Sequence, residues 1–327
     1  MNILPEMHLK DINLQLASAA TREAFGDALA KIGELDPNVV ALSADVAGSV
    51  QIAKFAAKFP NRFFNVGVAE QNLASVAAGL AYSGKIAFIG AFAAFSPGRN
   101  WEQIRTTICY GEANVKIEGS HAGLDVGEDG ATHQMLEDLA LTRCLPNMTV
   151  VSPCDYYEAY KATFAAWKTP GPFYIRCTRG KIPIFTTEQT PFELGKINLL
   201  CEGSDLAIVA TGNMVYPSLV AASMLEKEGL SVAVANMHTI SAPDENMLER
   251  LARTCGTILT VEDHQVKGGL GSAVCEALSA RYPVLIRRHG VNMTFGESGS
   301  GSQVLAKHGL DAKGIASVAK QQIEVRK

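Results

Sequence analysis

One carboxylate in this sequence stands where a proton-transfer group could work, at the junction of a predicted strand and a predicted helix. Residues 62–81 read RFFNVGVAEQNLASVAAGLA, and Glu70 is the one acidic residue among them. The apolar residues of 63–68 predict a buried strand end, and the small residues of 72–81 predict a helix packed closely against a sheet. The helix is therefore expected to begin near Glu70.

The neighbours of Glu70 favour a chemical role over a purely structural one. A negative charge in the first turn of a helix is favourable by a fraction of a kcal/mol, which would suffice as a structural role. However, Val68, Ala69, Leu73 and Ala74 leave little polar surface to hydrate a carboxylate. Glu70 is therefore expected to need a partner with which it can share a proton.

A second group of chemically capable side chains lies in residues 115–134, VKIEGSHAGLDVGEDGATHQ. His121 and His133 are twelve residues apart in a glycine-rich loop that follows a predicted strand. Loops of this kind expose side chains and backbone donors to a ligand, so core packing is a poor explanation for the two histidines.

Cations and small polar residues follow other predicted strand ends. The strand Val39–Ser43 leads into a small-residue loop that contains Ser49, and such loops are where open α/β sheets bind ligands. Arg179 follows the predicted strand 173–177, and its two-pronged donors suit a phosphate group. Without further evidence, Ser49, Arg179 and Arg22, which lies on a predicted helix, could equally be solvent-exposed residues that bind no ligand.

The two chemical stretches resemble the transketolase group of thiamine-diphosphate enzymes. Gly67-Val68-Ala69-Glu70-Gln71 is similar to the turn of its pyrimidine-binding domain, and the segment from His121 through Glu128-Asp129-Gly130 to His133-Gln134 is similar to its substrate loop. The resemblance implies that Glu70 shares a proton with the aminopyrimidine of thiamine diphosphate. It also implies further cofactor contacts, by the aromatic faces of Phe92 and Phe95 and by Asp45 in the Ser43-Ala44-Asp45 segment.

The same resemblance implies the substrate contacts. His133 and Asp129 would contact the C1 and C2 hydroxyls of a ketose, and His121 would approach its reacting and phosphate-bearing ends. Neutral imidazoles near pH 7 can move the proton that cleavage of a ketose requires. Arg22, Ser49 and Arg179 would bind the sugar phosphate. Gly98, followed by Arg99, departs from the family, which often has a third aromatic residue there.

A missing motif indicates that this chain works with a partner. Transketolases hold the diphosphate through Mg²⁺ on a Gly-Asp-Gly motif in a separate N-terminal domain, and this chain has no such triplet. We therefore expect no metal ligands here, thiamine diphosphate as cofactor, and Mg²⁺ ligated by an N-terminal partner subunit in an α2β2 heterotetramer. The chain is similar to the C-terminal half of a split transketolase, an enzyme that moves a two-carbon ketol unit from a ketose phosphate to an aldose phosphate.

Three alternatives remain open at this stage. The β chains of 2-oxo-acid dehydrogenase decarboxylases share the glutamate turn but lack the loop histidine. Deoxyxylulose-phosphate synthases share the Asp-Gly-x-Thr-His pattern but usually are single long chains with arginine in place of His121. A non-catalytic subunit could also keep the fold. Neither the sugars nor the choice between pentose phosphates and a specialised pathway follows from the sequence.

Bulk properties fit an ordinary globular protein. The 327 residues are 47% hydrophobic with a formal net charge of −4, which gives no basic excess for nucleic acid or an anionic membrane. The most apolar window, 86–95, is half the length of a membrane span. Seven scattered cysteines predict reduced core residues, and with no signal-like N-terminus a cytoplasmic location is expected.

The order of predicted elements indicates two doubly wound α/β domains. Strands and helices alternate on both sides of a predicted linker at 180–191, which implies mainly parallel sheets covered by helices. We predict a pyrimidine-binding domain over residues 1–190 and a transketolase C-terminal domain over 191–327. Gly268–Gly271, before a predicted helix, could cradle an anion, but no ligand is assigned to it.

Overall fold

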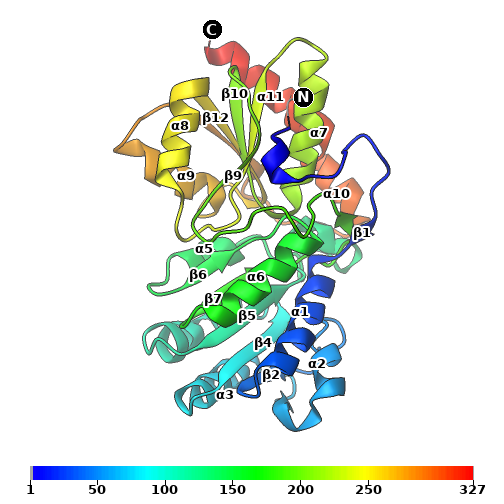
Figure 1. Ribbon diagram of the computed structural model, residues 1–327, viewed down its shortest axis with the longest axis vertical. Helices are drawn as coiled ribbons and strands as arrows, with labels where there is room; N and C mark the ends of the chain where they lie inside the picture. Colours follow the sequence, from blue (N-terminus) through cyan, green and yellow to red (C-terminus); the bar gives the residue numbers. More distant parts are fainter. Residues whose placement is uncertain (1–2, 327) are drawn as a thin grey trace.

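Two sheets with mainly parallel strands form the framework of the protein, and the computed structural model describes residues 3–326. One sheet comes from the first half of the chain and the other from the second half. Figure 1 shows the two α/β units stacked along the long axis of the molecule. The predicted fold class is confirmed.

The first sheet has six parallel strands in the order β3-β2-β4-β5-β7-β6. All residues of β2 and β5 are buried, as expected for a parallel sheet covered on both faces. Side chains alternate along β2, so that Val40 and Leu42 pack into one core cluster while Val39 and Ala41 pack into another. The strands are β2 (Val39–Ser43), β3 (Phe63–Asn65), β4 (Ile86–Phe92), β5 (Val115–Ser120), β6 (Thr149–Val151) and β7 (Phe173–Arg176).

Helices cover both faces of this sheet. α1 and α6 pack together on one face, and α3 and the helical segment 101–109 cover the other. The helices are α1 (Thr21–Leu35), α2 (Ala53–Lys58), α3 (Glu70–Tyr82), α4 (Trp101–Gln103) with its π-helical continuation Ile104–Cys109, α5 (Asp138–Arg143) and α6 (Tyr156–Lys168). The predicted helix 135–143 begins only at Asp138, because Met135 bridges to Ala122 and accepts a hydrogen bond from the backbone of Gly123.

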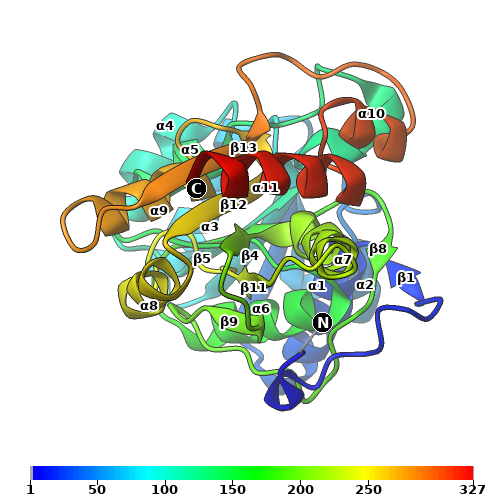
Figure 2. The ribbon, with the colours of Figure 1, turned by 90° about the horizontal axis from the view of Figure 1, so that it is seen from above.

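The second sheet has five strands in the order β13-β12-β10-β11-β9, of which only β9 is antiparallel to its neighbour. Figure 2 shows α11 lying above β12 and β13, and α11 also packs against α7. The elements are β9 (Asn198–Cys201), β10 (Leu206–Ala210), α7 (Val215–Glu226), β11 (Val232–Asn236), α8 (Glu245–Cys255), β12 (Thr257–Gln265), α9 (Leu270–Ser279), β13 (Leu285–Val291), α10 (Gly301–Lys307) and α11 (Ala312–Arg326). The sequence pattern did not predict β9, α10 or α11.

The N-terminal segment and the predicted linker are both ordered parts of the fold. The backbone N–H of Leu4 donates to the carbonyl of Leu200 on β9, which places Leu4 beside the second sheet (Figure 1). Two short antiparallel strands, β1 (Ser18–Ala19) and β8 (Ile182–Pro183), pair with each other, and Phe185 is fully buried. The division at residues 190 and 191 stays a prediction.

The strand before Glu70 is exposed, which corrects the prediction of a buried strand end. β3 is only three residues long and lies at the edge of its sheet. Phe64 is 41% exposed and Val68 is 74% exposed. An edge strand has a neighbour on one side only, so these apolar side chains are not covered by the described part of this chain.

Two smaller predictions are also settled. The glycine-rich turn 268–271, to which no ligand was assigned, binds a carboxylate of the chain itself, because the buried side chain of Glu262 accepts hydrogen bonds from the backbone N–H groups of Leu270 (2.7 Å) and Gly271 (2.8 Å). Of the seven cysteines, five are buried as predicted. Cys144 is exposed and Cys275 is half-buried, which corrects the prediction for these two.

A buried arginine joins the two units. Arg176, at the end of β7, donates through Nε to Asp138 Oδ2 at 2.9 Å and through Nη2 to the carbonyl of Asp263 on β12 at 2.7 Å. The hydroxyl of Tyr174 donates to the same Asp138 oxygen at 2.8 Å. Asp138 has no exposed surface, so its charge depends on these donors.

We predict that Arg176→Ala lowers the free energy of unfolding by roughly 3–5 kcal/mol, because it leaves the buried carboxylate of Asp138 without a counter-charge. Chemical denaturation monitored by circular dichroism would measure it. Arg281→Ala is the matched control, since Arg281 pairs with Glu245 and Glu249 on the surface, where water screens the interaction. Equal losses of unfolding free energy in the two variants would contradict a stabilising role for the buried ion pair of Arg176 and Asp138.

Candidate active site

Glu70 is the first residue of α3 and is 3% exposed, which confirms its predicted position and burial. The turn before it is fixed by Asn65, whose side-chain oxygen accepts from the backbone N–H groups of Asp45 (3.0 Å) and Gly67 (3.1 Å). Gly67 has φ +74°, a left-handed conformation that costs glycine little. The carboxylate is therefore aimed by the backbone turn and by the side chain of Asn65.

Arg99 is the partner of Glu70. Its Nη1 donates to Glu70 Oε2 at 2.6 Å, and its guanidinium lies 4.7 Å from the centre of the Phe95 ring. Asn100 donates to the backbone carbonyl of Glu70 at 3.0 Å. Within residues 3–326, Glu70 Oε1 accepts no hydrogen bond, so one oxygen is held and the other is available to share a proton with a ligand.

Two phenylalanines link the carboxylate to the histidines. Phe92, at the end of β4, and Phe95 have ring centres 6.1 Å apart. His121 stacks on Phe92 with 3.9 Å between ring centres, and His133 meets Phe95 edge-on at 5.5 Å. Residues that lie up to 63 positions apart in the sequence, from Glu70 to His133, therefore form one connected cluster.

His121 also connects this cluster to the predicted phosphate residues. Its Nε2 lies 3.2 Å from Nη1 of Arg22, and the same nitrogen of Arg22 donates to the backbone carbonyl of Ser49 at 2.7 Å. An arginine can only donate, so Nε2 of His121 must accept, which leaves the proton on Nδ1. Nδ1 then donates to the hydroxyl of Ser120 at 3.0 Å.

His121 is held in its neutral form. Burial lowers its pKa to about 3, and the neighbouring Arg22, Arg179 and His133 act in the same direction. A neutral imidazole at this position can accept a hydrogen bond or a proton from a ligand only through Nε2, which now faces Arg22. His133 is less buried and its Nδ1 lies 2.9 Å from the hydroxyl of Thr132.

A buried acid beneath the site was not predicted. Glu118, on β5, has no exposed surface, and neither of its carboxyl oxygens has a hydrogen-bond partner in the described chain. Gly90 makes room for it, because Oε2 lies 2.7 Å from where a Cβ of residue 90 would be. Burial raises the pKa of Glu118 well above its ordinary value, against the influence of Ser120 and Arg22. The sequence signal that could have revealed this buried acid is a glutamate within the otherwise apolar and small-residue strand VKIEGS.

Three other predicted residues stand apart from the central contacts. Arg179 Nη1 donates to the carbonyl of Val126 (2.7 Å) and to Glu128 Oε2 (2.8 Å), although its charge still acts on His121. Asp129 is exposed at the end of a short 3-10 helix. Asp45 is exposed and accepts from the side chain of Asn65 rather than contacting Glu70.

The described residues contain neither a metal cluster nor a membrane helix. No three side chains of His, Cys, Asp or Glu within residues 3–326 gather closely enough to hold a metal ion. In that same range, none of the helices combines the length and the apolar character needed to cross a membrane. The site of this chain therefore consists of a buried carboxylate, aromatic faces, imidazoles and guanidinium groups.

Comparison with known proteins identifies both units. Residues 17–184 match the family described as "Transketolase, pyrimidine binding domain", and residues 195–315 match "Transketolase, C-terminal domain". A "Putative transketolase C-terminal section" of Methanocaldococcus jannaschii is 43% identical, over 90% of this chain and 93% of that protein. The "6-deoxy-6-sulfo-D-fructose transketolase subunit SqwH" of a Clostridium species is 39% identical, over 93% of this chain and 94% of that protein.

A solved structure agrees with these matches. The protein titled "Split gene transketolase, inactive beta4 tetramer" is 43% identical and superposes with a TM-score of 0.87. The match covers 95% of this chain and 100% of that one. The similarity therefore spans both sheets and the interface between them.

We predict that His121 stays neutral from pH 5 to pH 8 with its proton on Nδ1, because its pKa is about 3 and Arg22 occupies Nε2. Nitrogen-15 NMR of histidine-labelled protein, with His121→Asn to assign the signal, would measure protonation and tautomer. Arg22→Ala should raise the pKa only in part, since burial is the larger cause. A signal that titrates between pH 6 and pH 7 in the unmodified protein would refute the arrangement.

Proposed function

The chain belongs to the transketolase family, and on that premise we propose that it is the C-terminal subunit of a split transketolase. With a partner chain it transfers a two-carbon ketol unit from a ketose phosphate to an aldose phosphate. The observation that supports this best is the connected set of contacts from Glu70 through Arg99 and the two phenylalanines to His121 and Arg22. It joins a proton-sharing carboxylate to a phosphate-binding cation.

The residues present fit thiamine diphosphate, on which the family depends. When bound, this cofactor supplies the nucleophilic carbon that cleaves the bond beside a ketose carbonyl. Glu70 keeps Oε1 free to hold a proton for the aminopyrimidine while Arg99 fixes Oε2. Phe92 and Phe95 offer aromatic faces close by, and Asp45 is proposed to contribute through the turn that Asn65 ties to Gly67.

The histidines are proposed to hold the sugar. His133, edge-on to Phe95 and less buried than His121, positions the substrate hydroxyls and exchanges a proton with them, together with the exposed Asp129. His121 presents a neutral ring beside Arg22 and orients the chain of the sugar towards its phosphate. Because a buried acceptor would stay unpaired with the wrong epimer, such contacts also select stereochemistry.

The phosphate end is proposed to contact Arg22, Ser49 and Arg179. Arg22 already spans from His121 to the Ser49 carbonyl, and Arg179 lies near enough for its charge to act on His121. Arg179 is paired with the exposed Glu128, so a sugar phosphate would take over its guanidinium from that carboxylate. Guanidinium groups bind phosphate through two parallel donors.

A partner chain is proposed to complete the site. The sequence has no Gly-Asp-Gly motif for Mg²⁺ and diphosphate, and the apolar side chains of Phe64 and Val68 are exposed just before Glu70. The related split-gene transketolase structure is titled an inactive beta4 tetramer. We propose an N-terminal subunit that ligates Mg²⁺ and covers this edge in an α2β2 heterotetramer. The name of the Clostridium relative includes 6-deoxy-6-sulfo-D-fructose, so the substrate of the present chain could be a specialised sugar and not a pentose phosphate.

We predict that the purified chain alone shows no ketol transfer and binds thiamine diphosphate weakly, because it lacks ligands for Mg²⁺ and diphosphate. Calorimetric titration and a coupled assay with xylulose or ribulose phosphate would measure both properties. Addition of the Gly-Asp-Gly-bearing N-terminal chain from the same organism should restore tight binding and turnover. Full activity of the single chain would contradict the proposal that the active site is divided between this chain and a partner chain.

We predict that Arg179→Ala raises KM for phosphorylated sugars roughly 10- to 150-fold in the reconstituted complex, the range expected for one charge-assisted contact. Activity with short unphosphorylated substrates should change much less, and Arg22→Ala should behave similarly. Glu128→Gln is the matched control, since it breaks the same ion pair but leaves the guanidinium free. A comparable KM rise in Glu128→Gln, or equal losses with both substrate classes, would assign Arg179 a structural role.

A further inference from the structure

Glu118 is a buried acid that none of the proposed contacts with cofactor or sugar uses. It lies on β5, has no exposed surface, and within residues 3–326 neither of its carboxyl oxygens has a hydrogen-bond partner. We propose that Glu118 is the internal counter-charge of Arg22 and competes with the sugar phosphate for that guanidinium. This competition rests on the proposed function, to which the phosphate contact of Arg22 belongs.

The space that holds the carboxyl group of Glu118 is apolar. A Cβ on Gly90 would lie 2.7 Å from Oε2 of Glu118, 2.8 Å from Cδ1 of Ile52 and 3.2 Å from Cγ2 of Val50. Glycine on β4 therefore leaves room for the carboxyl group, and the side chains of Val50 and Ile52 offer it no hydrogen bonds. An ionised carboxylate in such surroundings is costly unless a cation comes to it.

The groups that face Glu118 come from its own strand, from α1 and from the end of β7. Burial raises the pKa of Glu118, and the hydroxyl of Ser120 and the positive charge of Arg22 on α1 lower it. Cys177, after β7, is not a charged partner, because burial and the charge of Glu118 raise the pKa of its thiol well above its ordinary value. Lys116 is turned away, since its ammonium group donates to two backbone carbonyls near the start of β5. The described part of the chain therefore offers Glu118 one counter-charge, that of Arg22.

Arg22 is held at one nitrogen and keeps donors to spare. Its Nη1 donates to the carbonyl of Ser49 at 2.7 Å and faces Nε2 of His121 at 3.2 Å. Its Nε is buried and, within residues 3–326, has no hydrogen-bond partner, and Arg22 forms no ion pair in that range. A buried unpaired N–H and a buried unpaired carboxyl group are complementary, and the charge of Arg22 already acts on Glu118. A change in the side-chain conformation of Arg22 would join the two.

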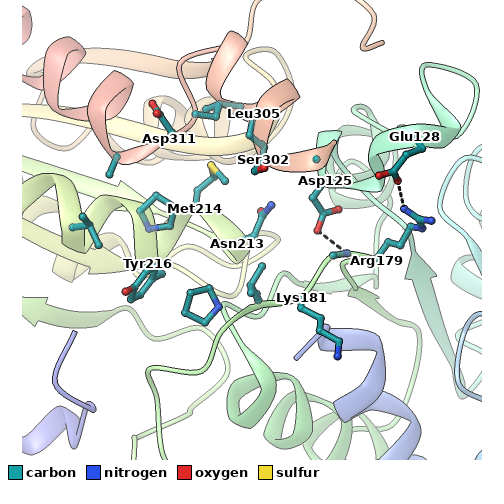
Figure 3. A pocket seen from close by; sticks show the side chains of 18 residues that line it. Asp125, Glu128, Arg179, Lys181, Asn213, Met214, Tyr216, Ser302, Leu305 and Asp311 are labelled. Carbon is teal, nitrogen blue, oxygen red and sulfur yellow. Dashed lines mark hydrogen bonds and ion pairs between the residues drawn. The ribbon is translucent and has the colours of Figure 1, made fainter. Parts of the chain in front are cut away.

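Arg179 shows the same relation in an exposed form. It lines a cavity of about 670 Å³ between the two α/β units, and its Nη1 donates to Glu128 Oε2 at 2.8 Å (Figure 3). Its charge, like that of Arg22, acts on His121. Each of these two arginines would therefore have a carboxyl group of its own chain that a phosphate displaces. The partner of Arg179 is exposed and its pKa is lowered, whereas Glu118 is buried.

The pH decides whether Glu118 or a phosphate holds Arg22. Burial raises the pKa of Glu118 well above its ordinary value. Below this pKa the acid is neutral and the guanidinium is free, whereas above it the carboxylate draws Arg22 away from His121. A phosphate that takes Arg22 therefore makes Glu118 take up a proton, and the affinity for phosphate falls as the pH rises through the pKa of Glu118. A sugar phosphate is already a dianion above about pH 7, so its own ionisation does not produce this fall.

Carbon-13 NMR of the full chain, labelled at the glutamate carboxyl carbon, tests the pairing without any assay of turnover. Glu118→Gln identifies the signal. We expect Glu118 to ionise at a higher pH than the exposed glutamates, within the pH range in which the chain stays folded. Arg22→Ala should weaken this ionisation about tenfold or more, as expected for the removal of a nearby opposite charge. Arg179→Ala is the matched control, because Arg179 acts on His121 but not on Glu118.

Kinetics of the reconstituted complex test the competition itself. The quantity is the KM for a phosphorylated sugar divided by the KM for a short unphosphorylated substrate, measured one pH unit below and one above the ionisation of Glu118. Competition for Arg22 should make this ratio rise about tenfold between the two pH values, with a much smaller change in kcat. In Glu118→Gln the ratio should stay at the lower value at both. Glu118→Leu, which suits the apolar neighbours, should behave in the same way if the amide disturbs folding.

Several results would overturn the proposal, with the fold of each variant checked by circular dichroism. Glu118 could ionise together with the exposed glutamates, or stay neutral throughout. Arg22→Ala and Arg179→Ala could change its ionisation equally. In an active complex, the KM ratio could fail to rise with pH, or rise as much in Glu118→Gln. Absence of ketol transfer in the complex would instead contradict the proposed function, and the dependence of Glu118 on Arg22 would still be measurable on the isolated chain.

Discussion

The carboxylate of Glu70 is the constraint on which the rest of the site depends. It is buried at the first turn of α3, where an unpartnered charge would be costly, and Arg99 satisfies only one of its oxygens. The turn that aims it is tied by Asn65 to the loop after β2, and Arg99 is in turn stacked on Phe95. The position of the carboxylate therefore also fixes that of the aromatic and cationic groups beside it.

Parallel strands explain why residues from distant parts of the sequence meet. The carboxyl ends of β2, β4, β5 and β7 lie at one edge of the six-stranded sheet, and the loops that follow them carry Ser49, Phe95, His121 and Arg179. Behind this edge, Arg176 connects Asp138 to the backbone of the second sheet. The second unit thus supports the loop that carries the histidines, and the cavity between the units lies directly against that loop.

The periodicity of apolar residues predicted the helices and strands around the site well. It did not predict which distant residues contact one another or which apolar side chains are exposed. The bounds of β2 and the start of α3 follow from apolar runs and small residues. The closeness of Arg22 and Ser49 was expected only from the family resemblance, and the contact of Arg22 with His121, 99 positions away, was not predicted. The exposure of Phe64 and Val68 could not be predicted, because an apolar strand looks the same whether its own chain or another covers it. The burial of Glu118 without a hydrogen-bond partner and the ion pair of Arg99 with Glu70 could not be predicted either, because both depend on tertiary packing that no local sequence pattern encodes.

The central claim is that Glu70 exchanges a proton with the bound cofactor. Its most direct test is the rate at which the C2 proton of thiamine diphosphate exchanges with deuterium, measured by NMR in the reconstituted complex with the unmodified chain and with Glu70→Gln. Positioned acid–base groups commonly contribute about 10²- to 10⁴-fold, so exchange should slow by at least about 10²-fold while thermal stability is retained. An unchanged exchange rate in a folded, cofactor-loaded Glu70→Gln complex would contradict the account.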